Sequence, residues 1–199
     1  MNDNNSTYKA EQSSANKQGT GQIVSTLVFL LGVFACYFGA ISGLLWIGPV
    51  AVVVIGAFRL RISSDLKKDL QVILLVGVIG IIVETLLILS RVYTPDPGKR
   101  ILLVWPFLPE WILALWVNFS FRIKDILIFI RGRVWLSSIM GFVFGILIFL
   151  SASARGLLTM RYSYISLLII SIMWAAAVFL MFYYSESIYF VEDEKYEKK

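Results

Sequence analysis

The sequence predicts an all-α, polytopic membrane bundle of about six transmembrane helices, with a short second helix. The first observation is composition: 58% of the 199 residues are hydrophobic and 16% are charged, and the mean hydropathy is +0.79. A soluble domain carries charge at about a quarter of its positions. The second is the stretch from Ile23 to Phe58, which holds 36 residues and no charged side chain. Continuous apolar windows without alternation favour helices over barrel strands.

This first apolar stretch is too long for one crossing. As a single helix it would extend about 54 Å, against roughly 30 Å of hydrocarbon in a bilayer. We therefore expect two helices, 23–46 and 49–62, separated by a turn near Gly48 and Pro49. Glycine ends helices readily, and proline is tolerated in the first helical turn. The second helix is short, so a partial insertion of this helix stays open.

Charged residues bound the remaining helices. Apolar windows predict helices at 70–91, which is interrupted by Glu84, at 108–130, which carries several polar residues, and at 134–154 and 162–185. These helices complete a transmembrane domain over 23–185. Residues 1–22 are polar and have no apolar periodicity, so they predict a disordered N-terminal tail. Residues 186–199 form a charged C-terminal tail.

The distribution of Lys and Arg predicts the orientation. With both termini in the cytoplasm, thirteen Lys and Arg lie on the inner side and five on the outer side, as the positive-inside rule requires. We expect a multi-pass protein of the cell inner membrane. If the helix 49–62 does not cross, every later segment inverts. Aromatic residues near the predicted span ends agree with membrane interfaces: Trp46, Trp105, Trp111, Trp135, Tyr162 and Tyr164.

Missing residue types narrow the chemistry. Histidine is absent, and Cys36 is the one cysteine. These absences exclude an intramolecular disulfide, histidine metal ligands and histidine-based acid–base catalysis. The sequence contains no phosphate-binding glycine loop and no nucleophile elbow. We expect no catalytic residues, cofactor-binding residues or metal ligands, no cofactor and no nucleic-acid partner, because the basic residues form short clusters and no continuous stripe.

Glu84 is a charged residue inside a predicted span. On the helix 70–91 it shares one face with Gly77 and Gly80, which lie seven and four residues before it. The two glycines let another helix approach closely. One interpretation is a proton-relay or substrate-binding carboxylate. The other, which we favour because a relay normally needs several such residues, is a carboxylate locked to a neighbouring helix by a basic or hydroxyl partner.

The fourth predicted helix offers candidate partners for this carboxylate. One stripe along it comprises Trp111, Leu115, Asn118, Arg122 and Asp125. Arg122 and Asp125 can pair on a single helix, and Asn118 can hydrogen-bond across helices. We predict that Arg122 or Asn118 lies within hydrogen-bonding reach of Glu84. The alternative is that Arg122, Lys124 and Asp125 only reach to the cytoplasmic interface.

Small residues recur every four positions in two other predicted helices. Such faces allow close helix packing, and we expect that packing to occur within one chain. The first face comprises Ala35, Gly39 and Gly43, and the second comprises Ser137, Gly141 and Gly145.

Several of these features together resemble a known family. They are Trp46-Ile47-Gly48-Pro49, an acidic residue late in the third helix (Glu84), Leu108-Pro109-Glu110-Trp111 leading into Leu115-Trp116, and the helix with Gly141 and Gly145. From about Phe34 to Leu158 the chain resembles the small bacterial inner-membrane proteins catalogued as domain of unknown function 2878. It departs from their pattern at Gly145-Ile146, where the family has Gly-Pro, and lacks a histidine that is usual after the second helix. The resemblance implies a membrane location and no established activity.

Two functional hypotheses follow. The leading one is a non-catalytic inner-membrane protein of the lipid-associated or assembly type, whose polar residues hold the bundle together. Its partners would be membrane lipids, and either another membrane protein or a second copy of the chain. The alternative is a small transporter or lipid-handling membrane enzyme that uses Glu84.

The predicted topology can be tested by cysteine labelling in intact cells. Lys9→Cys, Lys67→Cys and Lys198→Cys should resist a membrane-impermeant thiol reagent, because these positions are expected in the cytoplasm. Lys99→Cys should react. Labelling of Lys67→Cys without labelling of Lys99→Cys would show that the helix 49–62 does not cross.

Overall fold

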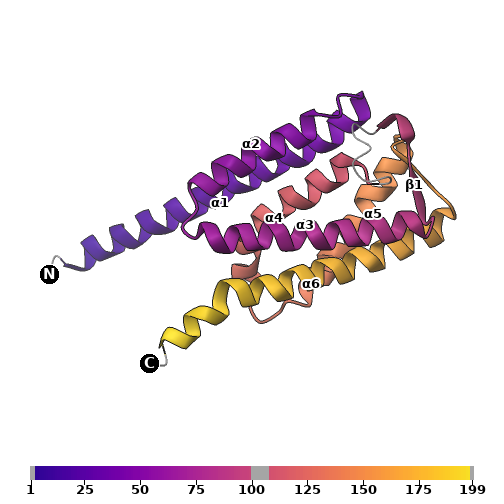
Figure 1. Cartoon of the computed structure of the whole chain (residues 1–199). Helices are drawn as coiled ribbons and strands as arrows, with labels where there is room; N and C mark the ends of the chain where they lie inside the picture. Colours follow the sequence, from indigo (N-terminus) through magenta and orange to yellow (C-terminus); the bar gives the residue numbers. More distant parts are fainter. Residues whose placement is uncertain (1–2, 100–107, 198–199) are drawn as a thin grey trace.

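In the part of the chain that the structure describes, six α-helices form one bundle. The computed structural model describes the backbone at residues 3–99 and 108–197, and the side chains at 22–99 and 108–190. The helices are α1 (Asp3–Ser42), α2 (Ile47–Arg61), α3 (Leu66–Leu89), α4 (Glu110–Ile130), α5 (Leu136–Ala154) and α6 (Ser163–Glu197). The start of α1 and the end of α6 lie at the same end of the bundle (Figure 1), which we call the tail end. The predicted all-α fold is confirmed.

The α1–α2 turn lies slightly earlier than predicted. α1 ends at Ser42, and Gly43 has a φ of +74°, a left-handed conformation that favours glycine after a helix. An ideal Cβ on Gly43 would meet no atom within 4 Å, so this residue ends α1 and does not serve as a packing position. Gly48 lies in the first turn of α2, where a Cβ would come within 2.6 Å of the Cα of Cys36. It brings α1 and α2 close together.

The other boundaries follow the predicted ones, with two differences. α3 begins at Leu66, before the predicted start at residue 70, because the side chain of Asp65 accepts a hydrogen bond from the Lys68 amide and caps the helix. α1 and α6 extend through much of the predicted tails 1–22 and 186–199. A helix that is already nucleated by an apolar span extends without a second nucleation cost.

A small β-ribbon marks the opposite end of the bundle, which we call the ribbon end. β1 (Tyr93–Pro95) pairs antiparallel with β2 (Leu158–Met160), and the 3-10 turn η1 (Pro97–Lys99) follows β1. This strand pairing was not predicted from the sequence. The ribbon pairs the segment after α3 with the segment between α5 and α6. The Tyr93 side chain within it is fully buried.

Small residues allow α5 to pack closely on α6. Ser137 is fully buried, and ideal Cβ atoms on Gly141 and Gly145 would lie 2.6 Å from the Trp174 oxygen and 3.0 Å from the Ser171 Cα. This face therefore packs within the chain. α4 contacts α1, α2, α3 and α6, so it occupies the interior of the bundle (Figure 1).

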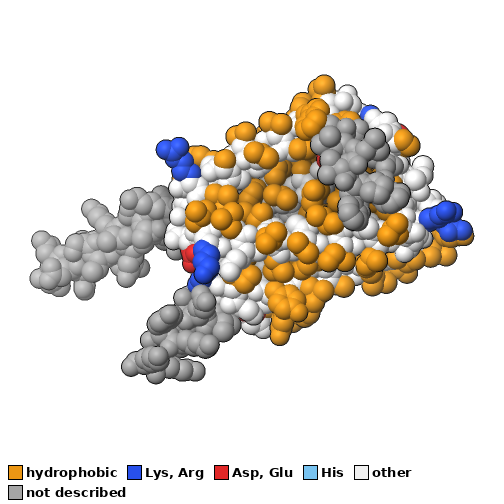
Figure 2. All heavy atoms as spheres, viewed as in Figure 1, with side chains coloured by type: hydrophobic (Ala, Val, Ile, Leu, Met, Phe, Trp, Pro, Cys, Tyr) orange, Lys and Arg blue, Asp and Glu red, His pale blue; other side chains and the backbone are white. Residues whose placement is uncertain are grey.

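Four helices are long and apolar enough to cross a membrane, by length and composition: Gln22–Ser42, Leu66–Leu89, Leu136–Ala154 and Ser163–Phe190. Hydrophobic side chains cover much of the visible face, and Lys and Arg lie toward its two ends (Figure 2). α2 has 15 residues, a length of about 22 Å. The chain is therefore a helical membrane protein.

The α5–α6 interface generates a stability prediction. Gly141→Ala should lower the free energy of unfolding by about 1–3 kcal/mol, because the added methyl meets α6 backbone and not a flexible side chain. Gly77→Ala is the control, since an ideal Cβ there meets nothing within 4 Å; helix propensity should raise stability by up to about 1 kcal/mol. Thermal unfolding in detergent measures both, and equal stability of the two variants would contradict the packing.

Candidate functional site

A fully buried carboxylate lies inside the bundle, nearer its ribbon end. Glu84 on α3 has no exposed surface. The Tyr93 hydroxyl donates to its Oε2 at 2.6 Å. The Trp116 and Trp174 indole nitrogens donate to its Oε1 at 3.2 and 2.9 Å. We call these four residues the Glu84 cage; its three donors come from β1, α4 and α6.

A glycine on α3 makes room for this arrangement. Gly80 lies one turn before Glu84, and an ideal Cβ on it would come within 2.7 Å of the Trp116 ring. The missing side chain lets the indole lie directly against α3, which brings its nitrogen to the carboxylate. Close approach of another helix was predicted on this face. It occurs at Gly80 and not at Gly77, which has open space around it.

Ring packing holds the donors in place. The ring centroids of Trp116 and Trp174 are 4.3 Å apart. Phe149 of α5 meets Tyr93 edge-on at 5.0 Å and Trp174 edge-on at 5.6 Å. Such aromatic contacts contribute about 0.5–1.5 kcal/mol each beyond the burial of their area. The donors are therefore fixed by rings that also contact one another.

Uncharged side chains compensate the buried Glu84 carboxylate. All three donors are neutral, and an indole nitrogen is a donor only. Within the described residues, no Lys or Arg bonds to Glu84. A buried polar group without partners would cost several kcal/mol in an apolar medium, so these hydrogen bonds stabilise the carboxylate and join three elements to α3.

Neither predicted partner reaches Glu84. The Asn118 amide donates instead to the Phe29 carbonyl of α1 at 3.0 Å, so it does bond across helices, as predicted. Arg122 donates to Asp125 Oδ2 at 2.7 Å, which is the pairing expected on one helix. Depth explains the correction: Arg122 lies six residues beyond Trp116 on α4, about 9 Å nearer the tail end.

A second polar centre joins α1, α2 and α4 near the tail end. Asp125 Oδ2 accepts hydrogen bonds from Ser25 at 2.9 Å, from Arg59 at 3.3 Å and from Arg122 at 2.7 Å. Arg59 also donates to the Phe121 carbonyl at 2.6 Å. We call this group the Asp125 junction. The roles of Ser25 and Arg59 were not predicted.

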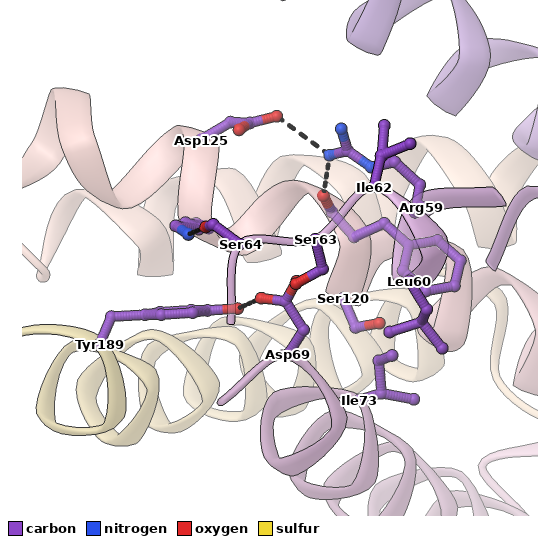
Figure 3. A pocket seen from close by; sticks show the side chains of 12 residues that line it. Arg59, Leu60, Ile62, Ser63, Ser64, Asp69, Ile73, Ser120, Asp125 and Tyr189 are labelled. Atoms are coloured by element: carbon purple, nitrogen blue, oxygen red, sulfur yellow. Dashed lines mark hydrogen bonds and ion pairs between the residues drawn. The ribbon is translucent and has the colours of Figure 1, made fainter. Parts of the chain in front are cut away.

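A polar cavity of about 220 Å³ lies beside the Asp125 junction (Figure 3). On its α3 side, Asp69 accepts hydrogen bonds from Ser63 at 2.6 Å and from Tyr189 at 2.8 Å. On its α4 side, the Lys124 ammonium lies 3.4 Å from the Ser64 hydroxyl and 5.4 Å from the centre of the Tyr189 ring. We call this space the tail-end cavity; α2, α3, α4 and α6 all contribute to its walls.

An apolar groove of about 160 Å³ lies next to the Glu84 cage. It is lined by residues of α1, α4, α5 and α6: Phe29, Leu30, Val33, Leu115, Trp116, Phe119, Phe144, Ile148, Trp174 and Val178. Trp116 and Trp174 belong to both features, because their rings line the groove and their nitrogens bond to Glu84. Glu84 itself does not line the groove.

Trp116 was noted only as part of the family resemblance, and no role was predicted for Tyr93, Trp116 or Trp174. A signal existed for the two tryptophans: they lie well inside α4 and α6, whereas the other described tryptophans lie near helix ends. An indole nitrogen at membrane depth needs an acceptor. The role of Tyr93 depends on the unpredicted ribbon. Over residues 22–99 and 108–190, no group of three or more Cys, Asp or Glu residues could hold a metal ion.

The fold and the site define a helical membrane protein with a buried carboxylate inside its bundle. The sequence profile of a family described as "Protein of unknown function (DUF2878)" matches residues 22–180, and the chain belongs to this family. The predicted resemblance is thereby confirmed over a longer stretch than Phe34–Leu158. No curated protein and no solved structure matches the chain.

The Glu84 cage predicts a graded loss of stability. Glu84→Leu removes the acceptor and leaves three buried donors unsatisfied, at about 1–3 kcal/mol each. Glu84→Gln should cost only about 1 kcal/mol, because its oxygen can still accept from both indoles while its amide donates to the Tyr93 hydroxyl. Thermal unfolding in detergent measures the order. The control is Leu86→Ala, at a side chain that is 48% exposed; Glu84→Leu as stable as this control would contradict the structural role.

Proposed function

We propose that this protein is a non-catalytic, lipid-associated bundle of the cell inner membrane, with both termini in the cytoplasm. In this proposal the Glu84 cage fixes the helices, and the apolar groove receives an acyl chain of a membrane lipid. One observation carries it: the two indoles that hold Glu84 also form a wall of the groove. A rigid apolar wall suits a hydrocarbon ligand.

The alternative is a transporter or lipid-handling enzyme that uses Glu84. Such a role would require the carboxylate to face a cavity in which substrate, water or a proton carrier can reach it. Glu84 lines none of the described cavities and has no exposed surface. This supports the non-catalytic proposal.

The position of the groove supports an acyl chain as its occupant. α1 packs mainly on α2 and α4, and α5 packs mainly on α6, and the groove lies between these two groups of helices. The lining of the groove is apolar. Its volume of about 160 Å³ is roughly five times the volume of about 30 Å³ that one water molecule occupies in the liquid. A short stretch of a lipid tail fits this space.

The charge distribution supports the orientation. Eight Lys and Arg side chains lie around the tail end of the described bundle: Arg59, Arg61, Lys67, Lys68, Arg122, Lys124, Arg131 and Arg133. At the ribbon end there are four: Arg91, Lys99, Arg155 and Arg161. The positive-inside rule assigns the tail end to the cytoplasm.

Photo-crosslinking tests the groove. The full chain is reconstituted with a phospholipid that carries a photoreactive group in its acyl chain, and adducts are mapped by mass spectrometry. Adducts should concentrate at Phe29, Phe144 and Ile148. Ile148→Trp fills the groove and should reduce them several-fold, whereas Leu147→Trp, at a neighbouring side chain that is 57% exposed, should not.

Two outcomes would oppose the proposal. Adducts spread evenly over the exposed apolar surface would show ordinary solvation by lipid with no seated chain. A Glu84→Gln variant that folds normally but loses an uptake or lipid-conversion activity of the parent would favour the alternative.

A further inference from the structure

Two unpaired charges of opposite sign line the tail-end cavity. Lys124 has no carboxylate within 4.0 Å among the described residues, and its contacts are the Ser64 hydroxyl and the Tyr189 ring. Asp69 likewise has no cation within that distance, and its contacts are the hydroxyls of Ser63 and Tyr189. Partly buried charges normally find a counter-ion, so each of these is available to a ligand.

The other two charged residues that line this cavity, Arg59 and Asp125, already form an ion pair. Arg59 and Asp125 bond to each other, and Arg59 also bonds to the Phe121 carbonyl. In Figure 3 this pair lies on one side of the cavity, and the Asp69–Tyr189 bond lies on the other. Asp125 also bonds to Arg122, so Arg59, Arg122 and Asp125 are already engaged with one another. A ligand in the cavity therefore meets one open cation, Lys124, and one open anion, Asp69.

The cavity lies at the level expected for lipid headgroups. Its lining includes Ser63 and Ser64 of the α2–α3 connection, immediately before the apolar span Leu66–Leu89. Apolar side chains, among them Ile62 and Ile73, line the same space. A ligand here has a polar end among charges and can continue toward hydrocarbon.

We propose that the tail-end cavity binds a phosphate ester that carries a primary amine, the chemistry of a phosphoethanolamine group. Lys124 and the Ser64 hydroxyl bind the phosphate, and Asp69 binds the ammonium. A simple anion would lie near the open carboxylate of Asp69, and a simple cation near Lys124, so a group with both charges is favoured over either. The volume of about 220 Å³ holds roughly seven groups the size of water, which suits a compact headgroup.

The test uses the purified full chain in detergent, with ligand-induced thermal shift as the readout. Phosphatidylethanolamine should stabilise the protein, because a ligand that binds the folded state raises its stability. Phosphatidylglycerol lacks the ammonium, and phosphatidylcholine lacks the ammonium hydrogens. Both should bind at least tenfold more weakly. Soluble glycerophosphoethanolamine distinguishes the source: competition at equal concentration indicates a free ligand, and failure to compete indicates that the lipid tail is required.

Matched variants locate the site. Lys124→Met and Asp69→Asn should each weaken phosphatidylethanolamine binding roughly tenfold, because each removes one charge-assisted contact. Lys67→Met removes an exposed charge at the same end, outside the cavity lining, and should leave binding unchanged. Asp69→Asn should also reduce the preference over phosphatidylglycerol, whereas a merely structural role would not change that ratio.

Three results would overturn the proposal: equal shifts with phosphatidylethanolamine and phosphatidylglycerol, equal losses in Lys124→Met and Lys67→Met, or no shift with either amine-bearing probe. The site is separate from the apolar groove, so these results are independent of the crosslinking outcome.

Discussion

A carboxylate placed inside a membrane bundle must find hydrogen-bond donors there, because hydrocarbon offers none. In this protein that requirement falls on Glu84, and three elements supply the donors: β1 with Tyr93, α4 with Trp116 and α6 with Trp174. The arrangement of α3, α4 and α6 is thereby specified at one point. Packing among hydrocarbon side chains alone would specify it less sharply, since lipid tails and leucines are similarly apolar.

Close backbone approach is the second condition of the architecture. Because Gly80 has no side chain, the Trp116 ring can pack directly against α3. Gly141 likewise allows α5 to pack against the backbone of α6. The Asp125 junction then joins α1 and α2 to α4 at a different depth. The two polar centres share α4, which explains why this helix occupies the interior although it carries charged residues.

Long apolar windows predicted the six helices and most of their boundaries, because lipid constrains length and polarity along the chain. Glu84 was likewise recognised as the charged residue inside its span. Its predicted partners, Arg122 and Asn118, were wrong because they were predicted from residue type and not from their depth in the bundle. Only the tryptophans near span ends were interpreted, as interface residues, and no role was predicted for the two that lie in mid-helix.

Other contacts could not be predicted from local patterns. The β-ribbon pairs short segments more than sixty residues apart, and neither segment has a strand pattern of its own. The contacts of Ser25 and Arg59 with Asp125 depend on the rotation of α1 and α2 about their axes, which a uniformly apolar face does not specify. Gly43 was assigned to a packing face because its spacing fits, whereas its positive φ shows that it ends the helix.

The long sequence separation within the Glu84 cage has a consequence for biogenesis. Glu84 precedes Trp116 by 32 residues and Trp174 by 90 residues. At a synthesis rate of about 5–20 residues per second, α3 leaves the ribosome roughly 5–18 seconds before its last donor exists. During that interval the carboxylate needs another means of compensation: a proton, water at the insertion machinery, or a chaperone. Glu84 therefore helps to specify the finished bundle, but before its donors are synthesised it raises the free energy of inserting α3 into the membrane.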